Sequence, residues 1–291
     1  MRRGIIIKEL NNSIKEFEII KTLNPIYQTL IFTLKRHWKK FTIFAIIEFL
    51  IVFSFGFLLY VLIPEYSIPL TQQEYFVGFI SAFLYLILIF GTCFFFSGII
   101  CSEFSNKTGY IVFPKTGKYK FILGKFLGNL IYILGITTIY YTFMILFAYY
   151  FYGAPIITRI WFSYGIAVLY VITLSSFVTF FSSFMKNVNM TIVITILILL
   201  IAYSIAEQMV VLFNPDIEPI FSLNYLANLL SATLQKDFLK NDSNRYEDIK
   251  IEDFTYRVWL TPTIEMGITI MIIYITVCLV LAALIFKRKQ L

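Results

Sequence analysis

Apolar residues form six long runs along the chain, and each is 23 to 25 residues long. The runs cover residues 41–63, 76–100, 126–150, 162–185, 189–213 and 262–286. A helix needs about 20 mostly apolar residues to cross a bilayer. None of the runs contains Lys or Arg, and the only charged residues in them are Glu48, Glu207 and Glu265. The pattern therefore predicts an all-α, polytopic membrane protein with six transmembrane helices.

The 40 residues before the first run are polar and basic, and they predict two short helices. The first covers 8–22. Asn24 and Pro25 then provide an N-cap and a first helical residue for the second, over 25–40. Its apolar face repeats every fourth residue, at Ile26, Leu30, Leu34 and Trp38. The opposite face is largely basic, which is typical of a helix in the membrane interface, although packing against the protein itself is the alternative. We therefore divide the chain into a cytosolic segment, 1–40, and a six-helix domain, 41–291.

Composition and charge narrow the class of protein. Hydrophobic residues make up 59% of the chain and charged residues 14%, about half the share in soluble domains, which excludes an ordinary soluble enzyme. The net charge is +7, but 18 Lys and Arg lie at the ends and in alternate connections, against 6 in the other three connections. This is a positive-inside signature with both termini in the cytosol, and it indicates contact with a lipid bilayer rather than with nucleic acid. Three cysteines in or beside apolar runs, with His37 as the only histidine, predict no disulfide and no metal site.

The connection between the second and third runs has an unusual composition. It spans 25 residues, 101–125, where a few would suffice, and it contains several turn-forming residues. Its notable positions are Glu103, Thr108, Gly109, Pro114 and the pair Gly124-Lys125. From the residues alone, the connection is either an ordinary loop or a docking element.

With these residues in this order, the chain resembles the permeases of ABC-type-2 exporters, the membrane subunits of ATP-driven export systems. That family has six spans, two cytosolic termini, an amphipathic connecting helix and a comparable loop after span two. In the family this loop contains, in order, a Glu, a Thr/Gly turn, a Pro-x-Ser-Arg motif and a Gly-Lys pair. When the positions are counted back from Gly124-Lys125, the family's Arg corresponds to Lys118 of this chain, and Gly117 replaces the family's Ser. The basic ending, 285–289, also matches, so the resemblance covers residues 24–291.

The resemblance implies a 2:2 complex in the plasma membrane. Two copies of this chain would form the pathway as a homodimer, and two copies of a separate ATPase would bind beneath them. The loop 101–118 would be the coupling helix, with Glu103, Lys107, Thr108, Gly109, Pro114 and Lys118. ATP and Mg²⁺ would bind the ATPase. The sequence agrees with a separate ATPase, because it contains no G-x-x-x-x-G-K-[ST] motif for ATP. We therefore expect no enzymatic activity and no cofactor on this chain.

Charged and small residues within the runs are the remaining candidates. An intramembrane carboxylate is a functional-site hypothesis by default. Because spans one, two and five face the dimer interface and pore in the resembled family, Glu48 and Glu207 are candidates for the pathway; hydrogen bonding between helices is the alternative. Gly124-x-x-x-Gly128 allows close helix packing. The connection 214–261 predicts a short external or re-entrant helix followed by a polar cap. An ion-coupled transporter or channel that uses the two carboxylates is the alternative function.

Overall fold

The structure of the chain is a computed structural model. It describes residues 2–58, 61, 69, 71–109, 117–235, 245–251 and 254–288. Residues 2–23, 249–251 and 254–256 are described by their backbone alone. Of the sites predicted above, Pro114 lies outside the described residues.

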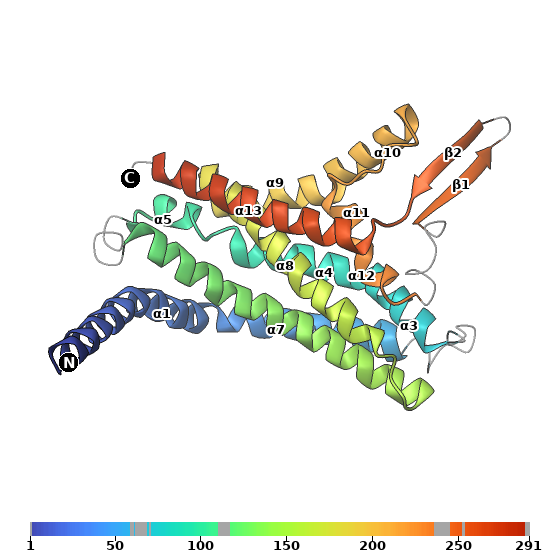
Figure 1. Cartoon of the computed structure of the whole chain (residues 1–291). Coiled ribbons are helices and arrows are strands. Elements are labelled where there is room, and N and C mark those ends of the chain that lie inside the picture. Colours follow the sequence, from blue (N-terminus) through green and yellow to red (C-terminus); the bar gives the residue numbers. More distant parts are fainter. Residues whose placement is uncertain are drawn as a thin grey trace.

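Six helical segments are long and apolar enough to cross a membrane, and each overlaps one of the predicted runs (Figure 1). They are Asn24–Leu58, Gln72–Ser105, Lys118–Tyr152, Arg159–Phe184, Val188–Phe213 and Ile264–Arg288. The first belongs to α1 (Arg2–Phe53), which continues into a π-helical turn, Ser54–Leu58. The third, fourth and sixth are the helices α7 (Lys118–Tyr152), α8 (Arg159–Phe184) and α13 (Ile264–Arg288). Each predicted span therefore corresponds to a helical segment that can cross a membrane.

Three of the six segments contain a π-helical turn, and in two of them the turn lies between α-helices. The second comprises α3 (Gln72–Phe79), the π-helical turn Ile80–Leu84, α4 (Tyr85–Phe96) and the short helix α5 (Cys101–Ser105). The fifth comprises α9 (Val188–Leu197), the π-helical turn Ile198–Ala202 and α10 (Tyr203–Phe213). The extra residue of a π turn rotates the side chains that follow it, so each half of such a span presents a different face.

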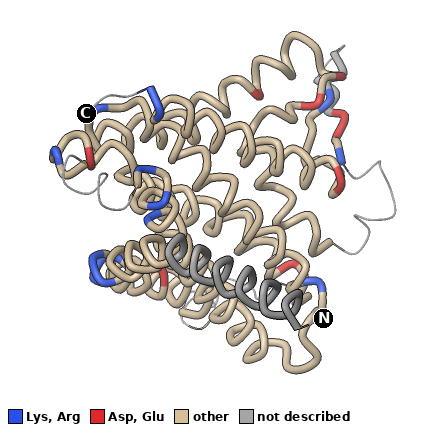
Figure 2. The backbone as a smooth tube through the Cα atoms, turned by 60° about the vertical axis from the view of Figure 1, so that its left-hand side comes forward, with Lys and Arg blue, Asp and Glu red and all other residues tan. Residues whose placement is uncertain are grey.

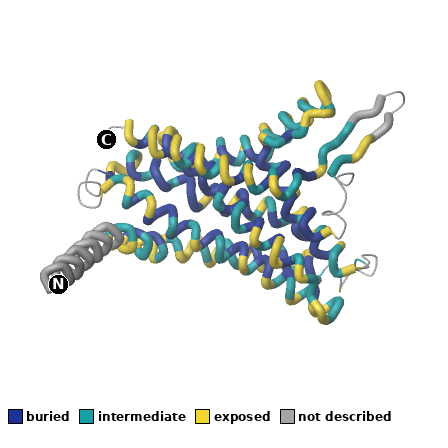
Figure 3. Tube along the Cα trace, viewed as in Figure 1, coloured by how far each residue is buried: buried dark blue, intermediate teal, exposed yellow. Residues whose placement is uncertain are grey.

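The most buried helix is α8, which contacts α4, α7, α9 and α13. Figure 3 shows the buried residues along the centre of the bundle. Buried hydroxyls on α8 donate to carbonyls of their own helix, as in Thr173 to Leu169 O (2.9 Å) and Thr179 to Ser175 O (2.7 Å), or to another segment, as in Ser182 to Ser97 O (2.7 Å). The hydroxyl of Ser175 has no partner among the described residues. Such small residues let neighbouring helices approach closely.

The helix α1 runs without a break through Asn24 and Pro25. The prediction of a helix that begins at Pro25 is therefore wrong. Thr29 Oγ1 donates to Pro25 O (2.7 Å), and Thr33 Oγ1 donates to Thr29 O (2.8 Å). The segment that contains Ile26, Leu30, Leu34 and Trp38 is thus continuous with span one and packs along α7 (Figure 1). Its position in the membrane interface stays a prediction.

The connection between spans five and six contains more structure than predicted. Two short helices, α11 (Leu223–Ala227) and α12 (Leu229–Ala232), fulfil the expectation of a helix here. The strands β1 (Tyr246–Ile251) and β2 (Phe254–Trp259) then pair antiparallel, with Tyr246 opposite Trp259. The prediction of an all-α fold is wrong in this respect. Alternating aromatic and β-branched residues favour strands over a merely polar cap.

An aromatic and ionic network surrounds the base of this hairpin. The guanidinium of Arg257 lies 4.0 Å from the ring centre of Tyr246 and donates to Asp248 (2.9 Å). Arg245 and the hydroxyl of Tyr225 both donate to Glu218, at 2.7 and 2.8 Å. Burial, followed by the hydrogen bond to Glu218, raises the pKa of Tyr225, so its phenol remains a donor at neutral pH.

The two ends of the bundle differ in charge. Figure 2 shows most Lys and Arg at the end that carries the C-terminus, and most Asp and Glu at the opposite end, near the hairpin. The basic end contains residues 35–40 of α1, the helix α5, the start of α7 and the end of α13. This end holds the loop singled out from the sequence, so it is where a functional site is considered first.

Candidate functional site

Glu103 is the centre of a buried polar cluster at the basic end. It lies on α5 and is only 4% exposed. Thr108 Oγ1 donates a 2.5 Å hydrogen bond to Glu103 Oε2, and Lys125 Nζ forms an ion pair with Glu103 Oε1. Lys125 lies on the first turns of α7 and is 6% exposed, with its ammonium 5.1 Å from the ring centre of Phe121. The cluster therefore fastens the loop after span two to the start of span three.

The remaining loop residues divide into exposed and packed positions. Lys107 and Thr108 are exposed, and Lys107 adopts a left-handed backbone conformation with φ of 55°. Gly109 is buried. Among the loop residues that the structure describes, 105–108 are therefore exposed, whereas Glu103 faces inward.

Phe286, near the end of α13, joins the C-terminal segment to the loop region. Its ring packs edge-on against Phe104 (5.9 Å between ring centres) and Tyr119 (6.1 Å), and Lys118 Nζ lies 5.9 Å from its centre. Phe286 is fully buried. Lys118 thus contacts the last transmembrane helix in addition to starting α7.

Gly124 and Gly128 lie on the face of α7 that packs against α1. A β-carbon at Gly124 would stand 2.7 Å from Ile26 O and 2.7 Å from Thr29 Cβ. A β-carbon at Gly128 would stand 2.9 Å from Thr33 Cβ. The face of α1 that packs on α7 therefore contains the buried residues Thr29 and Thr33. Trp38, which was predicted on the apolar face, is exposed. The two helices approach closely because small residues meet on both sides.

Glu48 and Glu207 lie on separate helices. Glu48 is 2% exposed on α1, and neither of its carboxyl oxygens has a hydrogen-bond partner among the described residues. Glu207 is half-buried on α10 and accepts a hydrogen bond from Ser222, the N-cap residue of α11. Glu207 thus links span five to the start of α11. The prediction that these carboxylates line a pathway stays a prediction.

The sequence did not predict how several residues of this end pair with one another. Lys125 was noted for its place after Gly124 but not as the partner of Glu103. His37 Nδ1 lies 2.9 Å from Asn129 Oδ1, and Asn129 Nδ2 donates to Phe95 O (2.8 Å). A lone histidine near a predicted span and an asparagine inside one were the available signals, since both are rare in apolar segments.

These features define a multi-pass α-helical membrane protein with a structured loop at its basic end. The family model described as ABC-2 family transporter protein matches residues 117–291, which is α7 to the C-terminus. The chain therefore belongs to the ABC-2 transporter family, as the resemblance predicted. No curated protein matches the chain. The loop residues before Gly117 lie outside the matched range, so their roles rest on the geometry above and on the resemblance.

Proposed function

We propose that this chain is the permease subunit of an ABC exporter, which acts as a homodimer with two copies of a separate ATPase that binds ATP and Mg²⁺. The proposal depends on one observation: the ABC-2 family model matches the chain from the start of span three to the C-terminus. The basic end would face the cytosol of a cell whose plasma membrane contains the protein, in accord with the positive-inside rule.

The loop 101–118 is the proposed docking element for the ATPase. Its anchoring supports this role, because Glu103 binds Lys125 on α7, α7 packs on α1 through Gly124, and Phe286 of α13 packs on Phe104. A displacement of the loop would therefore move three transmembrane helices together. In this proposal Glu103 is a positioning residue within the permease, and exposed Lys107 contacts the ATPase.

The distribution of burial supports association of two copies. The spans that contain α1 and α9–α10 are among the least buried of the six, and they present large exposed apolar side chains. Examples on both spans are Ile43, Ile46, Leu50, Val193, Leu197 and Ile201. These are spans one and five, which the resemblance places at the dimer interface; bilayer lipid would cover the rest.

An ion-coupled transporter receives less support. Glu48 lies in the α1 segment packed along α7, and Glu207 bonds to Ser222 beside α11, so the two carboxylates do not form one site. Family membership also favours a partner ATPase as the energy source.

The test is purification of the protein from native membranes in a mild detergent, followed by intact-complex mass measurement. We expect a 2:2 complex with a soluble ATPase. Lys107→Glu should release the ATPase, because it reverses an exposed charge of the docking loop. Lys186→Glu is the matched control, an exposed lysine in the α8–α9 connection. A homo-oligomer without ATPase in several detergents would contradict the proposal, and equal loss with both variants would contradict the assignment of the loop.

A further inference from the structure

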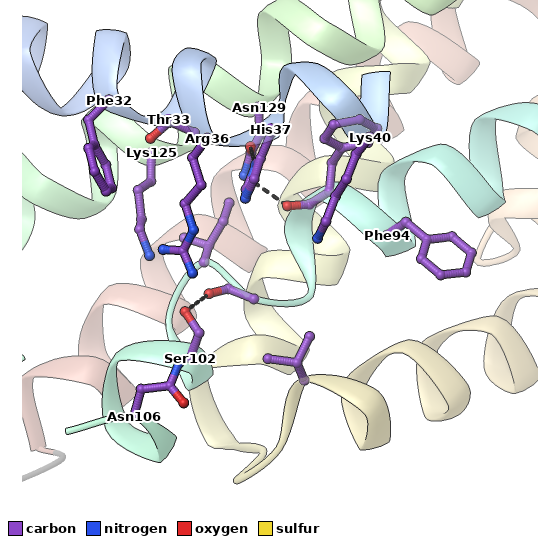
Figure 4. A pocket seen from close by; sticks show the side chains of 14 residues that line it. Phe32, Thr33, Arg36, His37, Lys40, Phe94, Ser102, Asn106, Lys125 and Asn129 are labelled. Atoms are coloured by element: carbon purple, nitrogen blue, oxygen red, sulfur yellow. Dashed lines mark hydrogen bonds between the residues drawn. The ribbon is translucent and has the colours of Figure 1, made fainter. Parts of the chain in front are cut away.

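A second feature of the basic end is a cavity of about 160 Å³ between α1, the end of span two, and the start of α7. This is several times the space that one water needs. Its lining combines basic groups with polar groups and a few apolar ones. Figure 4 shows the side chains of Arg36, Lys40 and Lys125 converging on it from two helices, with Ser102 and Asn106 on the opposite side.

The charges around the cavity are unbalanced. Arg36, Lys40 and Lys125 line it. Among the described residues, Lys125 pairs with Glu103, whereas neither Arg36 nor Lys40 takes part in a salt bridge. Arg36 also interacts electrostatically with Glu103, but that carboxylate is already paired with Lys125, so the groups around the cavity keep an excess of positive charge. Such an arrangement attracts an anion, since an anion there would relieve the repulsion between the cations.

Polar groups around the cavity can orient an anion that enters it. His37 Nδ1 donates to Asn129 Oδ1, since the amide nitrogen of Asn129 already donates to Phe95 O. This bond holds the imidazole in the wall of the cavity. The amide of Asn106 is exposed at the edge and offers a donor. Together with the planar fork of Arg36, these donors suit the several oxygens of a phosphate group.

The rim of the cavity indicates where the phosphate comes from. Phe32 and Phe94 line the cavity, and both remain largely exposed. Phe94 lies on a segment that is long and apolar enough to cross the membrane, so its exposed ring offers an apolar surface for an acyl chain. A ligand whose anionic head enters the cavity and whose tail lies on these rings satisfies both parts of the site. Basic residues at the ends of spans bind anionic lipid headgroups in this way.

We propose that this cavity binds the phosphate group of an anionic membrane lipid, held by Arg36 and Lys40. A free phosphate ion offers the same anion without the apolar part, and the experiment separates the two sources. The inference requires only that the chain spans a membrane, so it does not depend on an ATPase partner. A bound lipid would join α1 to span two on the side where Glu103 and Lys125 join span two to span three.

The experiment is native mass spectrometry of the full-length protein, titrated with dioctanoyl phosphatidylglycerol, dioctanoyl phosphatidylcholine or inorganic phosphate. We expect one saturable phosphatidylglycerol site per chain and weaker binding of the zwitterionic lipid. Arg36→Gln with Lys40→Gln should weaken phosphatidylglycerol binding by about tenfold or more. Lys35→Gln with Lys39→Gln is the matched control. These substitutions remove the same charge from the same helix, but at exposed lysines that do not line the cavity.

A further variant and the size-exclusion profile keep the test independent of folding. Asn106→Asp adds a negative charge at the edge without removing a cation, and it should also weaken binding. Competition by inorganic phosphate with the same sensitivity to these variants would support the anion site and identify free phosphate as its ligand. Equal weakening by both double variants, or by neither, in monodisperse protein would overturn the proposal, because binding would then reflect only general attraction to a basic surface.

Discussion

The buried ion pair of Glu103 and Lys125 is expected to have a large effect on stability. Lys125→Met leaves the carboxylate of Glu103 buried without its cation, and removal of one partner of a buried pair costs about 3–5 kcal/mol. Glu103→Gln combined with Lys125→Met removes both charges and should cost much less. The thermal midpoints of the purified single and double variants measure the difference as a double-mutant cycle.

Glu265→Gln provides the control for this cycle, because Glu265 is an exposed acidic residue at the opposite end. Its midpoint should stay close to that of the parent protein. Additive losses in the cycle, with no recovery in the double variant, would show that Glu103 and Lys125 do not interact in the protein.

At the scale of single residues, the sequence indicated where the chemistry lies but not how the groups pair. Glu103 and Thr108 were predicted to belong to one loop element, and both do. Their inward bond, and the partner 22 positions along the chain, were not predicted. His37 and Asn129 lie 92 positions apart. Side-chain periodicity within one helix contains no information on which face of another helix it meets, so such contacts require the fold.

Among the elements, the seam between α1 and α7 gives the sharpest prediction. Gly124→Ala would place a methyl group 2.7 Å from Ile26 O, so the helices must separate. Overpacking of this kind costs about 1–3 kcal/mol. Gly165→Ala is the matched control, because a β-carbon on this α8 glycine meets nothing within 4 Å and alanine favours helix. We expect a lower melting midpoint for Gly124→Ala and an equal or higher one for Gly165→Ala. The opposite order would contradict the close packing of α1 on α7.

Elements with a strong local signal were predictable, and those that depend on context were not. The six spans follow from the length and purity of their apolar runs. The prediction that a helix starts at Pro25 was wrong. Asn and Pro favour a helix start only weakly, and the packing of residues 24–40 on α7 outweighs that local preference. The hairpin was missed because its two six-residue strands, Tyr246–Ile251 and Phe254–Trp259, contain and adjoin many polar and charged residues, which favoured a polar cap. The alternation of aromatic and β-branched residues in 254–259 was the signal for it.

At the scale of the whole molecule, the opposite charges of the two ends predict the orientation in the membrane. The end with α5 and the start of α7 should face the cytosol, and the hairpin should face outward. The chain suits a cysteine-labelling test, because Cys93, Cys101 and Cys278 are buried. Glu247→Cys places a thiol on the exposed hairpin, and Lys186→Cys places one on the exposed α8–α9 connection.

In sealed right-side-out vesicles, a membrane-impermeant maleimide should label the Glu247→Cys protein at once and the Lys186→Cys protein only after permeabilisation. The parent protein measures background labelling of its three native thiols. The reverse pattern would place the hairpin in the cytosol, and Glu103, Lys107 and the proposed lipid site would then face away from the compartment that contains ATP. Because an ATPase must bind on the ATP side, that single result would also exclude the loop 101–118 as its docking element.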